Sequence, residues 1–196
     1  MNQEENKHII NKIKEKTITQ NQITKRIAVA ATFTGVGIVL SHINPFAFVP
    51  IIGAKIFPFA HFINVLTGVL IGFLFSSTTA LSIAIIRYSL TLGTVHAFHG
   101  HLAGAMVVSI TAYILWQYKP KYVDMAAFTE PLGTIFIAGT IAEFIQPVQE
   151  IVSIEGLLSF WILFGLSSIP GCILGYFMLK VLRRAGISRE DFIHQV

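Results

Sequence analysis

Three ionisable side chains stand inside otherwise apolar stretches of this 196-residue chain, namely Arg87, Glu130 and Glu143. Charged groups are costly in apolar surroundings, so they usually face a partner or a cavity. At a helical rise of about 1.5 Å per residue, Arg87 falls roughly midway in depth between the two carboxylates, and the sequence does not choose its partner. A buried ion pair that fixes helix packing and a contact with a ligand are both open interpretations.

A second group of polar side chains gathers at one end of the apolar stretches. His61 and Asn64 are three residues apart and therefore share a helix face. The segment 93–101 adds further hydrogen-bonding groups, namely Thr94, His96, His99 and His101. Lys55, shortly before His61, is a further candidate for this group. Any one of these histidines is readily explained as an interfacial residue without a ligand. Together, in an aromatic-rich surrounding, they favour a small-molecule site.

Metal binding is an alternative for the same histidines, because imidazole is a ligand for zinc, copper and nickel. The spacing of His96, His99 and His101 matches no strong ligand pattern, and their segment contains no cysteine or carboxylate. Cys172 is the only cysteine, which excludes an intrachain disulfide and a thiolate zinc cluster. We therefore predict no resident metal and no cofactor, and keep transition-metal capture as an alternative function.

Motifs for nucleotide-driven or hydrolytic catalysis are missing from the sequence. It contains no G-x-x-x-x-G-K-[ST] phosphate loop, no H-E-x-x-H and no G-x-S-x-G. Arg87, Glu130 and Glu143 show no catalytic spacing. We expect a protein that is not an enzyme, and a membrane enzyme that acts on lipid is the least favoured alternative.

Composition identifies the elements that must position these residues. The chain is 54% hydrophobic and only 12% charged, with a mean hydropathy of +0.69. An ordinary soluble domain carries about 25% charged residues, so a soluble domain is excluded, as are disordered and collagen-like chains. The expected fold is an all-α integral membrane protein.

Turn residues divide the long charge-free runs into six predicted transmembrane helices, since a helix needs about 20 apolar residues to cross a bilayer. Their approximate bounds are 26–43, 59–75, 78–92, 101–117, 126–146 and 157–182. The polar run 76–79 is interpreted as a tight turn between the second and third helices. We predict a compact six-helix domain over residues 26–183, between a polar N-terminal segment, 1–25, and a short tail, 184–196.

The basic residues predict the orientation of this bundle. All but two of the 14 Lys and Arg residues lie in the N-terminal segment, in the loop at 119–121 or at the C-terminal end. An even number of spans places both termini on one side, and the positive-inside rule makes that side cytoplasmic. The net charge of +4 is thus explained by orientation in a multi-pass protein of the cell membrane, and no nucleic-acid partner is expected.

The first predicted helix carries small residues at four-residue spacing. Such faces let helices approach closely in lipid. The spaced pairs are Ala28 and Thr32, Ala30 and Thr34, and Ala31 and Gly35, and they make this helix a candidate for docking another membrane subunit.

Three stretches together resemble a known family. They are 55–72 (KIFPFAHFINVLTGVLIG), 93–100 (GTVHAFHG, followed by Gly104 and Ala105) and 130–134 (EPLGT). They resemble the signature of ThiW-like membrane proteins, which are substrate-binding (S) components of energy-coupling factor (ECF) transporters. Order and spacing fit across residues 26–182. Phe73 and His99 depart from the pattern, because the family usually has proline at both positions.

The resemblance implies a six-helix S component that binds hydroxyethylthiazole, a thiamine precursor, at the extracellular side. It also implies an ABC-type importer in which a transmembrane coupling subunit and two ATPases supply the energy. The coupling subunit would dock on the small-residue face of the first helix, which maps onto Ala28, Ala31, Thr32 and Gly35.

A neutral thiazole alcohol needs an aromatic face for stacking and matched hydrogen-bond donors. Stacking is expected from Phe59, Phe98 or Trp161, between the outer ends of the second, third and sixth helices. The full set of expected substrate contacts is His61, Asn64, Arg87, Thr94, His96, His99, Glu130 and Trp161. Another vitamin, or a transition-metal ion, is the alternative substrate.

Overall fold

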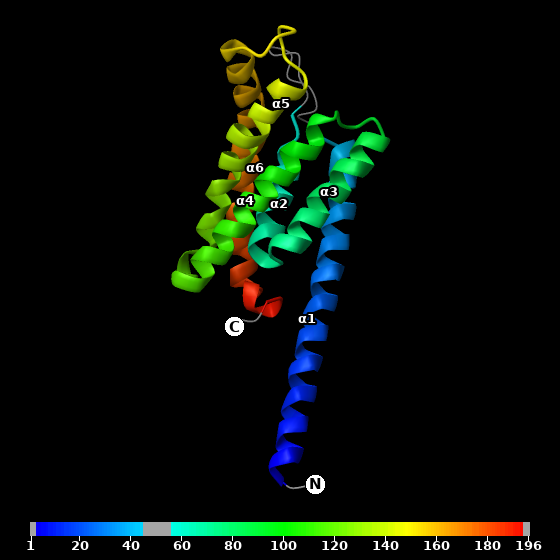
Figure 1. The fold of residues 1–196 in the computed structure, drawn as a ribbon, viewed down its shortest axis with the longest axis vertical. Helices are drawn as coiled ribbons and strands as arrows, with labels where there is room; N and C mark the ends of the chain where they lie inside the picture. Colours follow the sequence, from blue (N-terminus) through cyan, green and yellow to red (C-terminus); the bar gives the residue numbers. More distant parts are fainter. Residues whose placement is uncertain (1–2, 45–55, 194–196) are drawn as a thin grey trace.

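The computed structural model describes residues 3–44 and 56–193, and every regular element in these ranges is helical. The helices are α1 (Gln3–His42), α2 (Pro58–Leu70), α3 (Phe73–Ser89), α4 (His96–Tyr118), the 3₁₀ helix η1 (Pro120–Thr129), the π helix η2 (Leu132–Ala138), α5 (Gly139–Ile145), α6 (Ile154–Arg184) and the 3₁₀ helix η3 (Arg189–Asp191). Since η1, η2 and α5 follow one another as one helical segment, the predicted all-α bundle of six helices is confirmed (Figure 1).

In residues 3–44 and 56–193, four segments are long and apolar enough to cross a membrane by length and composition. They are Gln20–His42, His96–Tyr118, Pro120–Ile145 and Ile154–Arg184. The α2 helix has only 13 residues, or about 20 Å at 1.5 Å per residue, which is less than the roughly 30 Å core of a bilayer. All of its residues except Phe59 and Phe62 are buried. Protein therefore surrounds α2 and removes the need for it to match the bilayer alone.

The α2 helix lies in the middle of the bundle (Figure 1) and contacts α1, α3, α4, α6 and η1. Its apolar side chains join a buried cluster with α4 and α6. Members of this cluster include Val65, Leu66, Val69, Val108, Ala112, Trp116 and Leu179. Gly171 lets α6 approach α2 closely, because a Cβ atom there would collide with the carbonyl oxygen of Pro58 and the Cβ of His61. The cluster thus fixes the position of α2, which carries His61 and Asn64.

The turn between α2 and α3 differs from the prediction, which placed it at residues 76–79. The chain turns at Gly72, whose φ of +79° is a conformation that favours glycine. The run 76–79 continues α3 instead, and the hydroxyls of Thr67 and Ser76 hydrogen-bond across the turn at 2.9 Å. Thr78 and Thr79 donate to Phe75 O at 3.0 and 2.8 Å, and because hydroxyls can bond to the backbone of their own helix in this way, a run of them does not require a turn.

The start of α4 also differs from the prediction. The helix begins at His96 rather than at residue 101, so the outer histidines stand on its first turns and not in a loop. The connection from α3 is shorter than expected as a result. The α1 helix ends at His42, next to the predicted end at residue 43. Lys55 lies outside the described residues.

The α1 helix continues without a break through the predicted boundary at residue 25 (Figure 1). Its N-terminal end and η3 lie at the same end of the bundle, as an even number of spans requires. The division into residues 1–25, 26–183 and 184–196, and the cytoplasmic side of this end, stay predictions.

Two arginines satisfy the carbonyls at the C-terminal end of α2. Arg26 Nε donates to Ile71 O at 2.9 Å, and Arg189 Nη1 donates to Val69 O at 2.6 Å. The guanidinium of Arg189 also stands 5.0 Å from the ring centre of Trp116. Burial, with Arg26 nearby, lowers the pKa of Arg189 to about 10, so it remains a cation at neutral pH. Positive charge at a helix C-terminus is favourable, and it ties η3 to the bundle.

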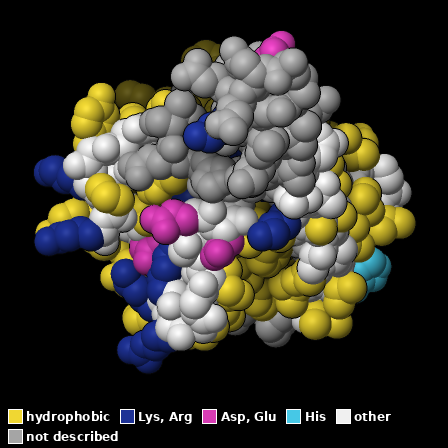
Figure 2. Space-filling model, turned by 90° about the horizontal axis from the view of Figure 1, so that it is seen from below, with side chains coloured by type: hydrophobic (Ala, Val, Ile, Leu, Met, Phe, Trp, Pro, Cys, Tyr) yellow, Lys and Arg dark blue, Asp and Glu magenta, His cyan; other side chains and the backbone are white. Residues whose placement is uncertain are grey.

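Charged side chains gather around this end of the molecule, where Figure 2 shows Lys and Arg together with Asp and Glu. Asp124, after α4, pairs with Lys180 at 3.1 Å and with Arg183 at 2.8 Å on α6. These pairs join η1 to the last turns of α6. The opposite end of the bundle holds the cavity described next.

Candidate functional site

A cavity of about 390 Å³ lies between α2, α4, α6 and the connection from α3 to α4. A volume of this size accommodates a small organic molecule. Its wall combines aromatic rings with polar side chains, among them Phe57, His61, Arg87, Thr94, His96, His101, Phe164 and Ser167. The cavity therefore offers both stacking surfaces and hydrogen-bonding groups.

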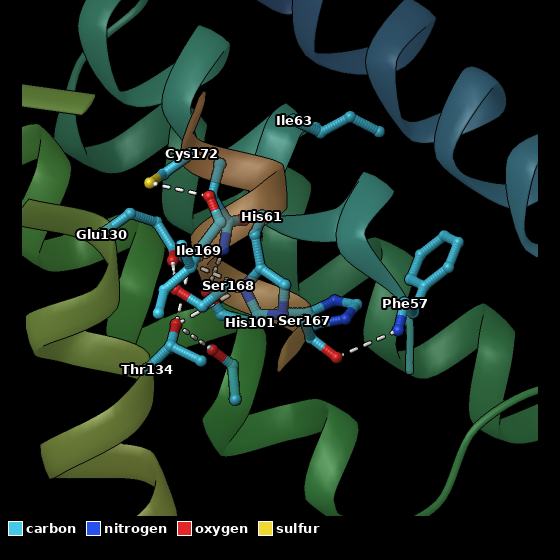
Figure 3. A network of polar contacts seen from close by, with 12 residues as sticks. Phe57, His61, Ile63, His101, Glu130, Thr134, Ser167, Ser168, Ile169 and Cys172 are labelled. Carbon is cyan, nitrogen blue, oxygen red and sulfur yellow. Dashed lines mark hydrogen bonds and ion pairs between the residues drawn. The ribbon is translucent and has the colours of Figure 1, made fainter. Parts of the chain in front are cut away.

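Glu130 lies beneath this cavity, at the junction of η1 and η2, and is completely buried (Figure 3). Its Oε1 atom meets His61 Nδ1 at 2.7 Å, and it accepts hydrogen bonds from Thr134 Oγ1 at 2.8 Å and Asn64 Nδ2 at 3.2 Å. Ser168 donates to Oε2. Removing a carboxylate from water is costly, and these hydrogen bonds compensate for that cost. Glu130 therefore fixes the orientation of the His61 ring.

The backbone around Glu130 is adapted to its position. A Cβ atom at Gly104 of α4 would overlap Oε1 of Glu130, so only glycine leaves room for the carboxylate. Pro131 has no N–H to donate, and the helix after it widens into the π segment η2. Such π segments are frequent at functional sites. The motifs 104–105 and 130–134 thus meet at one buried carboxylate.

A row of aromatic and cationic groups continues from His61 to the α3 side of the cavity. The rings of His61 and His101 meet edge to face, with centroids 6.0 Å apart. Arg87 Nη1 stands 3.0 Å from His101 Nε2, and Arg87 Nη2 donates to Leu92 O at 3.2 Å. Because arginine only donates, Nε2 of His101 accepts, which leaves the proton of this imidazole on Nδ1. Phe57 covers one face of the guanidinium, 3.9 Å from its ring centre.

Arg87 pairs with neither of the two carboxylates between which the sequence left the choice open. Glu130 is engaged by His61, and Glu143 accepts hydrogen bonds from the backbone N–H groups of Val148 at 3.2 Å and Ser153 at 3.0 Å. Within residues 3–44 and 56–193, no ion pair includes Arg87. Glu143 instead holds the connection between α5 and α6.

The two outer histidines face each other on the first turns of α4. His96 Nδ1 and His99 Nε2 are 3.1 Å apart, and their rings pack against Phe160 and Phe164 of α6. His96 lines the cavity, whereas His99 stands beside it. In the described part of the chain, no group of three or more His, Cys, Asp or Glu side chains is placed to hold a metal ion.

Trp161 lies outside this arrangement. Its Nε1 donates to Thr140 Oγ1 at 3.1 Å, and its ring packs edge-on against Phe136. It lines a separate apolar groove with Leu158 and Ile162. The expected stacking residues Phe59 and Phe98 also do not line the cavity.

The eight candidate residues therefore separate into groups. Those that line the cavity are His61, Arg87, Thr94 and His96, while Asn64 and Glu130 lie beneath it. Sequence reasoning missed Phe57, Phe164 and Ser167, and it mentioned His101 without assigning it a contact. His101 shares a face with Ala97 and Gly104, so a helix extended back to His96 would have found it. The sequence gives no comparable signal for the α6 residues.

An all-helical bundle that spans the membrane around a polar and aromatic cavity defines a multi-pass membrane protein with a site for a small molecule. The sequence model of one protein family matches residues 27–185, and its description is thiamine-precursor transporter protein (ThiW). The chain belongs to this family, as its motifs predicted. No curated protein and no solved structure matches the chain. The protein is accordingly a multi-pass protein of the cell membrane, from a family that transports thiamine precursors.

Proposed function

We propose that this chain is the substrate-capture subunit of an ECF-type ABC importer and that it binds hydroxyethylthiazole at the extracellular end. The supporting observation is the cavity of about 390 Å³, which lies at the end of the bundle opposite η3 and has aromatic and hydrogen-bonding walls. The sequence has no phosphate loop, so the proposal assigns the energy supply to two separate ATPases. The chain itself then captures substrate and catalyses no reaction.

The cavity suits a small aromatic ring with polar substituents. Phe57 and Phe164 offer ring surfaces, and aromatic pairs add about 0.5–1.5 kcal/mol beyond their buried area. His61 is oriented through Nδ1 by Glu130, which directs its other ring nitrogen to hydrogen-bonding with a ligand. Ser167 Oγ accepts from the N–H of Phe57 at 3.1 Å and keeps its own proton to donate.

The α1 helix supports docking of a coupling subunit. Its four predicted docking residues, Ala28, Ala31, Thr32 and Gly35, are all exposed. A Cβ atom at Gly35 would meet nothing within 4 Å, whereas one at Gly37 would collide with Ile83 of α3. The helix therefore uses one face for its own bundle and leaves the small-residue face free. In lipid, such a face is suited to close packing with another helix.

Titration of the purified protein with hydroxyethylthiazole tests the substrate. We expect saturable binding at micromolar concentration or tighter, measured by calorimetry. His61→Ala should weaken this binding about tenfold or more, because the ligand loses an oriented hydrogen bond worth about 1.4 kcal/mol. The exposed His42 on α1 gives a matched control, and His42→Ala should leave the affinity unchanged.

Two outcomes would contradict the assignment. Binding of a different vitamin, without binding of any thiazole, would move the chain to another substrate. Stoichiometric zinc, nickel or copper on protein purified without chelator, with affinity lost in His96→Ala, would favour the metal alternative.

A further inference from the structure

We propose that this cavity binds thiazoles that carry an anionic group, a carboxylate or a phosphate, more tightly than the neutral alcohol, because Arg87 binds the anion. The inference rests on the proposed function for the thiazole part and names the chemical class of the substrate. A thiazole acid or a thiazole phosphate ester fits this description, whereas the neutral alcohol lacks the charge.

Arg87 is a buried cation at the cavity wall, and several of its N–H donors are unused. Its side chain is only 8% exposed, and it lines the cavity. A guanidinium has five N–H donors. The hydrogen bonds to His101 and Leu92 use two of them, and both acceptors are neutral. In the described ranges Nε has no hydrogen-bond partner. The guanidinium therefore keeps both its full charge and unused donors at the wall of the cavity.

The carboxylates of the described residues lie away from the cavity wall. Among the described residues, no Asp or Glu lines the cavity. Glu130 lies below it and is saturated by other donors, and Glu143 is committed to the connection before α6. The segment 45–55, outside the described residues, contains no Asp or Glu in its sequence. A buried charge without a counter-charge is destabilising. An anionic ligand would remove this cost on binding.

The guanidinium of Arg87 is held in a fixed orientation. Phe57 packs against its face at 3.9 Å, and the bonds to His101 and Leu92 hold its plane. A planar fork with a fixed orientation suits carboxylate and phosphate oxygens, which accept two parallel N–H bonds. The hydroxyls of Thr94 and Ser167 can add donors from the facing walls. The polar contacts of the cavity are thus dominated by donors.

The experiment compares three thiazoles on the same purified protein. They are hydroxyethylthiazole, its phosphate monoester, and the thiazole acetic acid with the same ring. We expect at least one of the two anions to bind ten times or more tightly than the alcohol. The two anionic arms distinguish a phosphate from a carboxylate. Equal affinity of all three compounds would overturn the proposal.

Variants of Arg87 test the source of this preference. Arg87→Gln should weaken binding of the preferred anion tenfold or more and change binding of the alcohol less than threefold. Arg87→Lys retains the charge without the fork and should give an intermediate loss, which keeps the test valid if the glutamine variant does not fold. Arg184 is exposed on the last turn of α6, and Arg184→Gln is the matched control. A preference for the anion that survives in both Arg87 variants would overturn the proposal.

A separate arm distinguishes failure of this inference from failure of the proposed function. Benzoate and inorganic phosphate are tested for an Arg87-dependent rise in melting temperature. If no thiazole binds but one of these anions stabilises the wild type clearly more than it stabilises Arg87→Lys and Arg87→Gln, the anion site stands and the thiazole substrate is wrong. If the alcohol binds but no anion of any kind binds, the proposed function stands and the anion site is wrong. If nothing binds, both are wrong.

Discussion

At the scale of single residues, the buried charges of Glu130 and Arg87 have opposite kinds of partner. Glu130 is surrounded by donors from its own chain, including His61 and Ser168. Arg87 donates its hydrogen bonds to neutral acceptors, and an aromatic ring covers one face of its guanidinium. A charge that is already satisfied positions its neighbours, whereas a charge without a counter-ion is available to a ligand. The same distinction explains why these residues should respond differently to mutation.

Glycine at 104 should be essential for the carboxylate below the cavity. Gly104→Ala places a Cβ atom onto Oε1 of Glu130, so either the carboxylate or α4 must move. We expect a destabilisation of about 1–3 kcal/mol, the usual range for overpacking, and a weaker affinity for the ligand. Gly35→Ala is the control, since nothing lies within 4 Å and alanine favours a helix by about 1 kcal/mol. Thermal melting that ranks the two variants the other way would refute this account of Glu130.

The sequence and the structure point to different aromatic residues of α6 as the substrate contact. Trp161 was expected to stack on the substrate, but it lines an outer groove, while Phe164 lines the cavity. Phe164→Leu should therefore raise the dissociation constant about five- to tenfold, through the lost ring contact. Trp161→Leu should change it less than threefold. Titration of both variants decides the point, and a larger effect at Trp161 would favour the original expectation.

At the scale of elements, hydropathy predicts the helical segments. It does not predict where each helix ends or which of its faces turns toward the cavity. The Ser and Thr run at 76–79 suggests a turn, yet Thr78 and Thr79 donate to the carbonyl of Phe75 within α3, and Gly72 makes the turn. His61 and Glu130 are far apart in sequence, and a single sequence does not show that they meet. Their pairing depends on the packing of α2 against α4 and η1. The face of α6 that meets the cavity depends in turn on how this helix packs on α2.

The short α2 helix should depend on the arginines at its C-terminal end. Arg189→Ala removes the donor to the carbonyls of Gly68 and Val69 and the contact with Trp116. Buried carbonyls left without a donor cost about 1–3 kcal/mol, so we expect a lower melting temperature. The exposed Arg184 provides the control variant, Arg184→Ala. A melting temperature equal to that of the wild type in Arg189→Ala would show that η3 does not stabilise α2.

At the scale of the whole molecule, the bundle has a different chemistry at each end and on each side. The cavity occupies one end, and the charged residues around η3 occupy the other. The α1 helix stands at the side, where it packs on α3 and α2 but leaves a face of small residues exposed. The importer subunit that we propose would bind its substrate at one site and its partner at another. These two surfaces should therefore be separable by mutation.

Bulk on the small-residue face of α1 should block assembly without affecting capture. Gly35→Leu and Ala31→Leu add side chains to exposed positions, so the isolated subunit should keep its melting temperature and its affinity for the ligand. Co-purification with the coupling subunit and ATPases should fall about tenfold or more, because small-residue interfaces in lipid depend on close backbone approach. Ser159→Leu adds the same bulk to an exposed position on α6 and should assemble normally. Normal assembly of both α1 variants would place the partner elsewhere, and loss of ligand binding in them would show that the two surfaces are not independent.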